Sequence, residues 1–334
     1  MSPRSGFPSA IAADILRYIA IKQALGCRFA SISDTLFKLD QFLSRLANPP
    51  GDLTPETFRQ WTQTLEPLSA NTRLARMRAV RNFCIYRRRT APECFVPDPT
   101  QFPKAHVAVR PHIFSDSEVA NLLGHCEALS EDLARSPLRW ATTRLAIVLL
   151  YTTGLRRGEL IRLRIRDYDA CTQTLMVRAS KFHKSRLLAL PADIANEVER
   201  FLKARDAAYP SALDTAPLLR SPYGPDQSFT GERLYVNLRL LFARAGITTA
   251  NGRLPRVHDF RHSFAVNALI RWYHAGVNVE ARLPLLATWL GHVSILSTYH
   301  YLHFVEDLRS AASSRFLDSY GGVIAAAGQQ GEGA

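Results

Sequence analysis

Residues 156–301 of the sequence contain six side chains whose types could together cut and remake a phosphate ester. Two are arginines, two are histidines, one is a lysine and one is a tyrosine: Arg156, Arg261, His258, His292, Lys181 and Tyr301. Guanidinium groups hold phosphate oxygens in a planar fork, a phenol can attack phosphorus, and a lysine can protonate a leaving oxygen. Such chemistry needs neither a metal ion nor a cofactor, and we expect none.

Arg156 lies in the segment TGLRRGEL, residues 153–160. The apolar run before it predicts a helix that Gly154 can end in the left-handed conformation. Arg156 and Glu159 would then stand at the start of a second, short helix. Taken alone, the segment also fits an ordinary helix–turn–helix whose arginines face solvent.

Lys181 and Lys184 lie in a short polar turn between two strand-like segments, residues 174–179 and 186–190. This pattern predicts a β-hairpin. Either lysine could supply a proton, because an ammonium group placed beside arginines and away from water has a lowered pKa. A solvated turn is the alternative interpretation.

His258 and Arg261 are three residues apart in the segment HDFRHSFA, so a helix would carry them on one face. The apolar Phe260 and Phe264 would lie on a neighbouring face toward the core. His262, which follows Arg261 directly, is expected to be structural.

His292 follows Gly291, which can end the helix before it, and Tyr301 comes nine residues later. Tyr299 is a second candidate for the same role. A phenol with an ordinary pKa of about 10 is a weak nucleophile at neutral pH. A base beside the phenol could remove its proton, and two arginines could stabilise the negative charge.

The order, local sequences and spacings of these residues resemble the tyrosine recombinase (phage integrase) family, most strongly between residues 153 and 303. The resemblance implies that Arg156 and Arg261 grip the oxygens of a scissile DNA phosphate. It also implies that Glu159 orients Arg156 and that His292 donates a hydrogen bond to a phosphate oxygen.

The resemblance further makes Tyr301 the nucleophile, which would form a 3′-phosphotyrosine, and gives His258 the phenolic proton. Lys181 would protonate the departing 5′-oxygen. The family's hairpin turn usually contains glycines and this one has none. Lys184 therefore stays an alternative, although alignment on the downstream Arg186 favours Lys181.

Apolar residues at helical spacing predict a mainly α-helical protein with one small β-hairpin. Prolines concentrated between residues 92 and 111 predict an extended linker. We expect a basic helical domain over residues 1–105 with a linker to about 111, a catalytic domain over 112–320, and a flexible or partner-packed tail over 321–334. By resemblance, the first would be a core-binding domain, and the two would form a C-shaped clamp on duplex DNA.

The sequence has 42 basic and 29 acidic residues and a net charge of +13. This balance favours a polyanionic partner, because phosphate contacts release condensed counterions. The first 110 residues are the more basic part, with 16 basic and 8 acidic side chains. The side chains expected to contact DNA are Arg73, Arg76 and Arg78 on a predicted helix over 70–86, and Lys184.

Five scattered cysteines, with no pair at metal-ligand spacing, predict free thiols in a reducing cytoplasm. The longest apolar run, residues 145–151, is far shorter than the roughly 20 residues of a membrane span. We expect a cytoplasmic, nucleoid-associated protein that has no membrane partner. The resemblance implies a tetramer on double-stranded recombination sites, and it allows for accessory recombination factors.

The pattern thus predicts a site-specific DNA recombinase of the integrase or transposase type. Two other functions also fit. A type IB topoisomerase would use the same chemistry to relax supercoils as a monomer. A basic DNA-binding regulator would keep the site residues but be catalytically inert.

Overall fold

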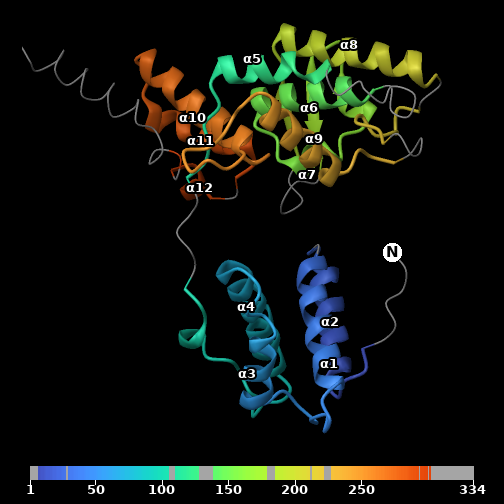
Figure 1. The fold of residues 1–334 in the computed structure, drawn as a ribbon, viewed down its shortest axis with the longest axis vertical. Coiled ribbons are helices and arrows are strands. Elements are labelled where there is room, and N and C mark those ends of the chain that lie inside the picture. The colour runs from blue at the N-terminus through green and yellow to red at the C-terminus, as the bar shows by residue number, and fades with distance from the viewer. Residues whose placement is uncertain are drawn as a thin grey trace, which may run out of the picture. The chain divides into compact units, whose positions relative to one another are not determined.

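The computed structural model describes residues 7–27, 29–104, 110–127, 138–178, 185–210, 213–221, 227–292, 294–299 and 301. The chain forms two compact units, Met1–Val109 and Arg110–Ala334, which we name unit 1 and unit 2 (Figure 1). Lys181, Lys184, residues 105–109 of the expected linker and the tail over 321–334 lie outside the described residues.

The described residues of unit 1 form four α-helices and one short 3₁₀ helix. They are α1 (Ala12–Ala24), α2 (Ala30–Ser44), α3 (Pro55–Gln63), α4 (Ala70–Arg87) and η1 (Pro99–Gln101). Thr54 caps α3 by accepting a hydrogen bond from the Thr57 N–H, and Pro55 takes the first helical position, where its missing N–H costs nothing. The core of this unit is built around Trp61, Phe83 and apolar side chains of all four α-helices.

Unit 2 is also mainly helical and contains the sheet. Its elements are α5 (Asp116–Gly124), α6 (Arg139–Thr153), α7 (Arg157–Leu160), η3 (Ile165–Asp167), β1 (Tyr168–Asp169), β2 (Thr174–Val177), β3 (Arg186–Ala189), α8 (Ala192–Ala208), α9 (Gly231–Arg244), α10 (Asp259–His274), α11 (Val279–Leu290) and α12 (Leu296–Tyr299). The predicted mainly α-helical fold is confirmed.

The predicted hairpin is present as β2 and β3, which pair antiparallel from Thr174 opposite Ala189 to Val177 opposite Arg186. A third strand, β1, pairs with β2 and was not predicted. It has two residues, too few for a period-two pattern to appear in the sequence.

Helix α6 is the centre of unit 2 and packs against α5, α7, α8, α9 and α10. Ten of its fifteen residues are buried, so it is apolar on nearly every side. Because the helix is held all round, its carboxyl end at Thr153 has a fixed position, and the site is built on that end.

Candidate active site

Two helix ends meet at the centre of the site. Helix α6 ends at Gly154 with φ 65° and α11 ends at Gly291 with φ 66°, both left-handed as predicted for Gly154. A side chain at Gly154 would place its Cβ 2.6 Å from Cδ1 of Phe264, so any other residue would have to displace that ring and adopt a strained φ. The last carbonyls of a helix lack partners within it and carry partial negative charge. These two ends therefore present acceptors for cations.

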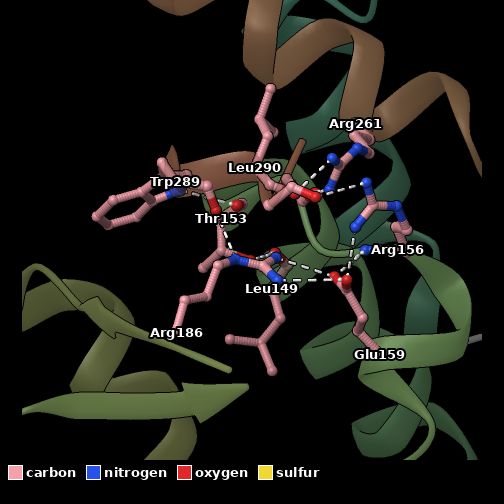
Figure 2. A network of polar contacts seen from close by, with 10 residues as sticks. Leu149, Thr153, Arg156, Glu159, Arg186, Arg261, Trp289 and Leu290 are labelled. Atoms are coloured by element: carbon pink, nitrogen blue, oxygen red, sulfur yellow. Dashed lines mark hydrogen bonds and ion pairs between the residues drawn. The ribbon is translucent and has the colours of Figure 1, made fainter. Parts of the chain in front are cut away.

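Arg261 of α10 joins the two helix ends. Its Nη1 donates to the carbonyl of Gly154 and its Nη2 to the carbonyl of Leu290, each at 2.6 Å (Figure 2). The residue is only 1% exposed. Burial, and then the nearby Arg156, lower the pKa of Arg261 to about 10, so it is still a cation at neutral pH.

Arg156 comes directly before α7 and is held by Glu159 of that helix. Its Nη1 donates to Oε1 of Glu159 at 2.8 Å and its backbone N–H donates to Oε2 at 3.0 Å. Its Nη2 donates to the carbonyl of Gly291 at 3.1 Å. The structure therefore brings Arg156, Glu159 and Arg261 together around the ends of α6 and α11.

A third arginine, Arg186 of β3, enters the same network and was not predicted as a site residue. It donates to both carboxylate oxygens of Glu159 and to the carbonyl of Trp289 (Figure 2). Trp289 in turn donates from Nε1 to the carbonyl of Thr153 at 3.0 Å. Local spacing could not reveal these contacts, because the partners of Arg186 are 27 and 103 residues away along the chain.

Tyr301 is 3% exposed and lies against two histidine rings. The ring of His262 is 5.4 Å from it, edge to face, and the ring of His292 is 6.1 Å away and stacked. Burial raises the pKa of Tyr301, opposed by the charge of Arg261 and a hydrogen bond with it. The phenol is therefore protonated at neutral pH and must lose its proton to act as a nucleophile.

The three histidines near Tyr301 are neutral at pH 7. Burial and neighbouring charges lower the pKa of His292 and of His262 to about 4. The pKa of His258 is also lowered, by desolvation and then by Arg261, although its side chain remains exposed. Its ring lies 4.7 Å from that of His262, so the two residues form one cluster beside the tyrosine.

Thr298 fixes one side of His292, because Nδ1 of the ring and the Thr298 hydroxyl form a hydrogen bond of 2.8 Å. Among the described residues, the other ring nitrogen, Nε2, has no hydrogen-bond partner. Tyr299, the alternative nucleophile, is 40% exposed and differs in this respect from the buried Tyr301.

In unit 1, the expected DNA contacts lie on α4. Arg76 and Arg78 line a groove of about 440 Å³ between α2 and α4. Arg73 is half-buried, and its Nε has no hydrogen-bond partner among the described residues. In the described part of the chain, no group of three or more His, Cys, Asp or Glu residues could hold a metal ion. No described helix is long and apolar enough to cross a membrane.

Comparison with known proteins gives the class. The model of the phage integrase family matches residues 114–307. A Sinorhizobium fredii protein named as a putative integrase/recombinase, y4rE, is 34% identical over 303 residues, covering 90% of this chain and 94% of the relative. The tyrosine recombinase XerD of Bradyrhizobium diazoefficiens is 27% identical over 81% of this chain and 84% of its own length. The chain therefore belongs to the phage integrase family.

The solved structures agree on the fold. The XerH site-specific recombinase bound to its palindromic difH substrate, in a post-cleavage complex, matches with a TM-score of 0.61 and 20% identity. The match covers 85% of this chain and 78% of that one. Family and relatives together identify a site-specific tyrosine recombinase, an enzyme that exchanges DNA strands.

Proposed function

We propose that this recombinase cuts and rejoins duplex DNA through a covalent bond between Tyr301 and a 3′-phosphate. The observation that carries the proposal is the buried phenol, which interacts with Arg261 beside neutral histidines and close to a cluster of arginines. In this step the phenolic oxygen bonds to phosphorus and the bond from phosphorus to the 5′-oxygen breaks. The ester energy is kept, so a 5′-hydroxyl of another strand can reverse the step.

The arginines would bind and stabilise the phosphate. Arg156 and Arg261 would contact the non-bridging oxygens, and Glu159 would orient Arg156 through the two hydrogen bonds described above. His292, fixed by Thr298, would donate a hydrogen bond to one of these oxygens. The guanidinium groups of Arg156 and Arg261 are already oriented by backbone carbonyls of two helix ends. They would therefore need little reorganisation when negative charge develops on the phosphate.

Two proton transfers complete the step. His258 is the proposed acceptor of the phenolic proton, because a lowered pKa keeps its imidazole neutral at pH 7. Lys181 is the proposed donor to the 5′-oxygen, with Lys184 as the alternative. Both lysines lie outside the described residues, so their support comes from the sequence.

The proposed partner is double-stranded DNA carrying a recombination site. A net charge of +13 favours it. Arg73, Arg76 and Arg78 of unit 1 are the proposed backbone contacts there. We further propose that four protomers act on two sites, with accessory factors setting direction, in the cytoplasm where the DNA lies.

A suicide duplex tests the covalent step. The DNA flanking the gene supplies the candidate site. A nick just downstream of the cleavage point lets the short fragment with the new 5′-hydroxyl leave, so that the adduct accumulates. The parent should form a protein–DNA adduct, which Tyr301→Phe abolishes and the matched control Tyr299→Phe retains. An adduct that persists in Tyr301→Phe, or none with the parent on its bound site, would contradict the proposal and favour an inert regulator.

Two plasmid assays separate recombination from topoisomerase activity. A recombinase should delete or invert the segment between two sites on one plasmid. Relaxation of a plasmid that lacks the site, with no deletion on the two-site plasmid, would instead identify a topoisomerase.

A further inference from the structure

Arg186 is a buried arginine at the first position of a short strand. It is paired with Val177 of β2, and its side chain is 9% exposed, whereas the next residue, Leu187, is 56% exposed. A guanidinium removed from water is costly unless its donors and its charge are satisfied. Its partners should therefore explain why it is there.

The guanidinium of Arg186 connects three separate elements. From β3, its Nη1 and Nη2 donate to Oε1 and Oε2 of Glu159 at 3.3 and 2.9 Å, a two-pronged contact with α7. Its Nε donates to the carbonyl of Trp289 at 2.6 Å, near the end of α11. The strand, the short helix and the helix end that precedes His292 are thus fixed to one planar group (Figure 2).

Glu159 shares its two oxygens between Arg186 and Arg156. Oε1 accepts from Nη1 of Arg156 at 2.8 Å, and Oε2 accepts from the Arg156 backbone N–H at 3.0 Å. The carboxylate is 2% exposed, so it needs a nearby cation. If Arg156 were the cation that neutralised Glu159, a DNA phosphate would have to compete with this carboxylate for the positive charge of Arg156.

We propose that Arg186 is a positioning residue for the cleavage step. It neutralises and orients the Glu159 carboxylate, so that Arg156 keeps its alignment and its charge for the scissile phosphate. Gly291 leaves room for this arrangement, since a Cβ there would lie 3.0 Å from Nη1 of Arg186. The inference rests on the proposed covalent cleavage by Tyr301.

The first test compares two arginine-to-lysine substitutions on the same sheet. Arg178, after β2, also pairs with a buried carboxylate, that of Asp167 at 2.6 Å, which does not belong to the network of Figure 2. Lysine keeps the charge but cannot span two carboxylate oxygens and a carbonyl. At saturating DNA, Arg186→Lys should slow single-turnover adduct formation about 10- to 100-fold, the cost of misplacing a catalytic group by about an ångström.

Arg178→Lys should keep the parent rate within about twofold, because Arg178 is itself 55% exposed, lysine keeps its charge beside Asp167, and the pair does not contact Arg156 or Glu159. DNA affinity should change little in both variants, because unit 1 and most basic residues are untouched. A parent-like cleavage rate in a folded Arg186→Lys enzyme would overturn the inference. Thermal melts of both variants verify folding.

A double-mutant cycle with Glu159→Gln asks whether Arg186 acts through the carboxylate. If it does, the double variant should be no more than about twice as slow as the slower single variant, because coupled residues are not additive. Effects that multiply would show independent actions and overturn the inference. If Arg186→Lys lowers the melting temperature, all four proteins of the cycle are compared at a temperature at which each is folded.

A substrate with a sulfur at the 5′ leaving position separates the remaining routes. It should rescue Lys181→Ala but not Arg186→Lys, and rescue of Arg186→Lys would mean that Arg186 acts through the hairpin lysine. Absence of any adduct with the parent would instead contradict the covalent mechanism itself, which keeps the two failures distinguishable.

Discussion

The two units use buried arginines in opposite ways. In unit 1, Arg87 donates from Nε to Asp14 at 2.8 Å and from Nη1 to Asp52 at 2.5 Å, so one guanidinium meets two carboxylates. In unit 2, the network of Figure 2 places three guanidiniums around the single carboxylate of Glu159 and several backbone carbonyls. The first arrangement is balanced by its own acids, whereas the second has an excess of positive charge.

The pKa values follow this difference. Burial alone would lower the pKa of Arg87, but its hydrogen bonds with Asp52 and Asp14 raise it above the ordinary value. Burial and the neighbouring Arg156 lower the pKa of Arg261 to about 10. An anion that binds beside Arg261 would therefore stabilise its charged form. The comparison teaches that Arg87 is paired within the fold, while the excess positive charge of the unit 2 arginines supports their proposed role in binding a phosphate.

The largest expected effect is on the proposed proton donor, Lys181. Lys181→Ala should slow cleavage about 10²- to 10⁴-fold, the usual contribution of a general acid. Single-turnover adduct formation on suicide DNA measures the reduction in rate, and Lys184→Ala is the matched control. A larger reduction in Lys184→Ala, with Lys181→Ala near parent, would transfer the role to Lys184.

The next largest effect compares substitutions of two buried arginines, Arg261 in unit 2 and Arg87 in unit 1. Arg261→Lys should slow cleavage about 10²- to 10³-fold, because a pair of stabilising donors at the phosphate is removed. Arg87→Met should instead destabilise unit 1 by about 1–2 kcal/mol, since the partly exposed Asp52 and Asp14 lose this cation, although Asp14 keeps its contact with Arg17. Cleavage kinetics and urea unfolding on both variants measure this. The contrast between the units fails if Arg87→Met slows cleavage in the folded protein as much as Arg261→Lys does.

A smaller effect is expected from pH, because nine of the ten histidines lie in unit 2. The pKa values of His262 and His292 are about 4 in the folded state, against about 6.5 in an unfolded chain. The unfolded chain therefore binds more protons between these values, and stability is lost as pH falls from 6.5 to 4. At pH 5, each histidine should cost about 1–2 kcal/mol relative to pH 7.5.

Urea unfolding at the two pH values tests this expectation. His262→Gln should remove about half of the stability loss between pH 7.5 and pH 5 that His262 and His292 together cause. His274→Gln, a change at an exposed histidine at the end of α10, is the control and should leave the dependence unaltered. Equal pH dependence in all three proteins would exclude the half-buried ring of His262 as a cause.

The smallest expected effect lies on the surface of unit 1. Arg76→Ala with Arg78→Ala should make the slope of log affinity against log salt less steep by about 0.9 for each phosphate that is no longer neutralised. Fluorescence anisotropy with the recombination-site duplex across a salt series measures the slope. An unchanged slope would remove α4 from the proposed DNA contacts, and Glu56→Gln on α3 controls for a general change of charge.

Much of the fold could be predicted from local patterns. The helix ending at Gly154, the cap at Thr54 and the hairpin of β2 and β3 each depend on neighbours within a few residues. The two-residue strand β1 could not be predicted, because only its pairing with β2 defines it.

The candidate site divides in the same way. Arg156 and Glu159 are three residues apart, and their contact follows from helix geometry. In the sequence, Arg186 serves only to align the hairpin with the family, and nothing local to His262 predicts the contact between its ring and that of Tyr301. Neither contact has a local signal, since both join segments that are distant in the chain.

The sequence by itself determined the residue types, their order and the helices that carry them, because propensities, caps and the left-handed glycine act over one or two turns of chain. Only the tertiary structure decided which groups meet. The ends of α6 and α11 come together through the packing of unit 2, and their unpaired carbonyls then fix Arg261, Arg156 and Arg186. The physical reason is that burial and electrostatic pairing depend on distance in space, which local spacing does not specify.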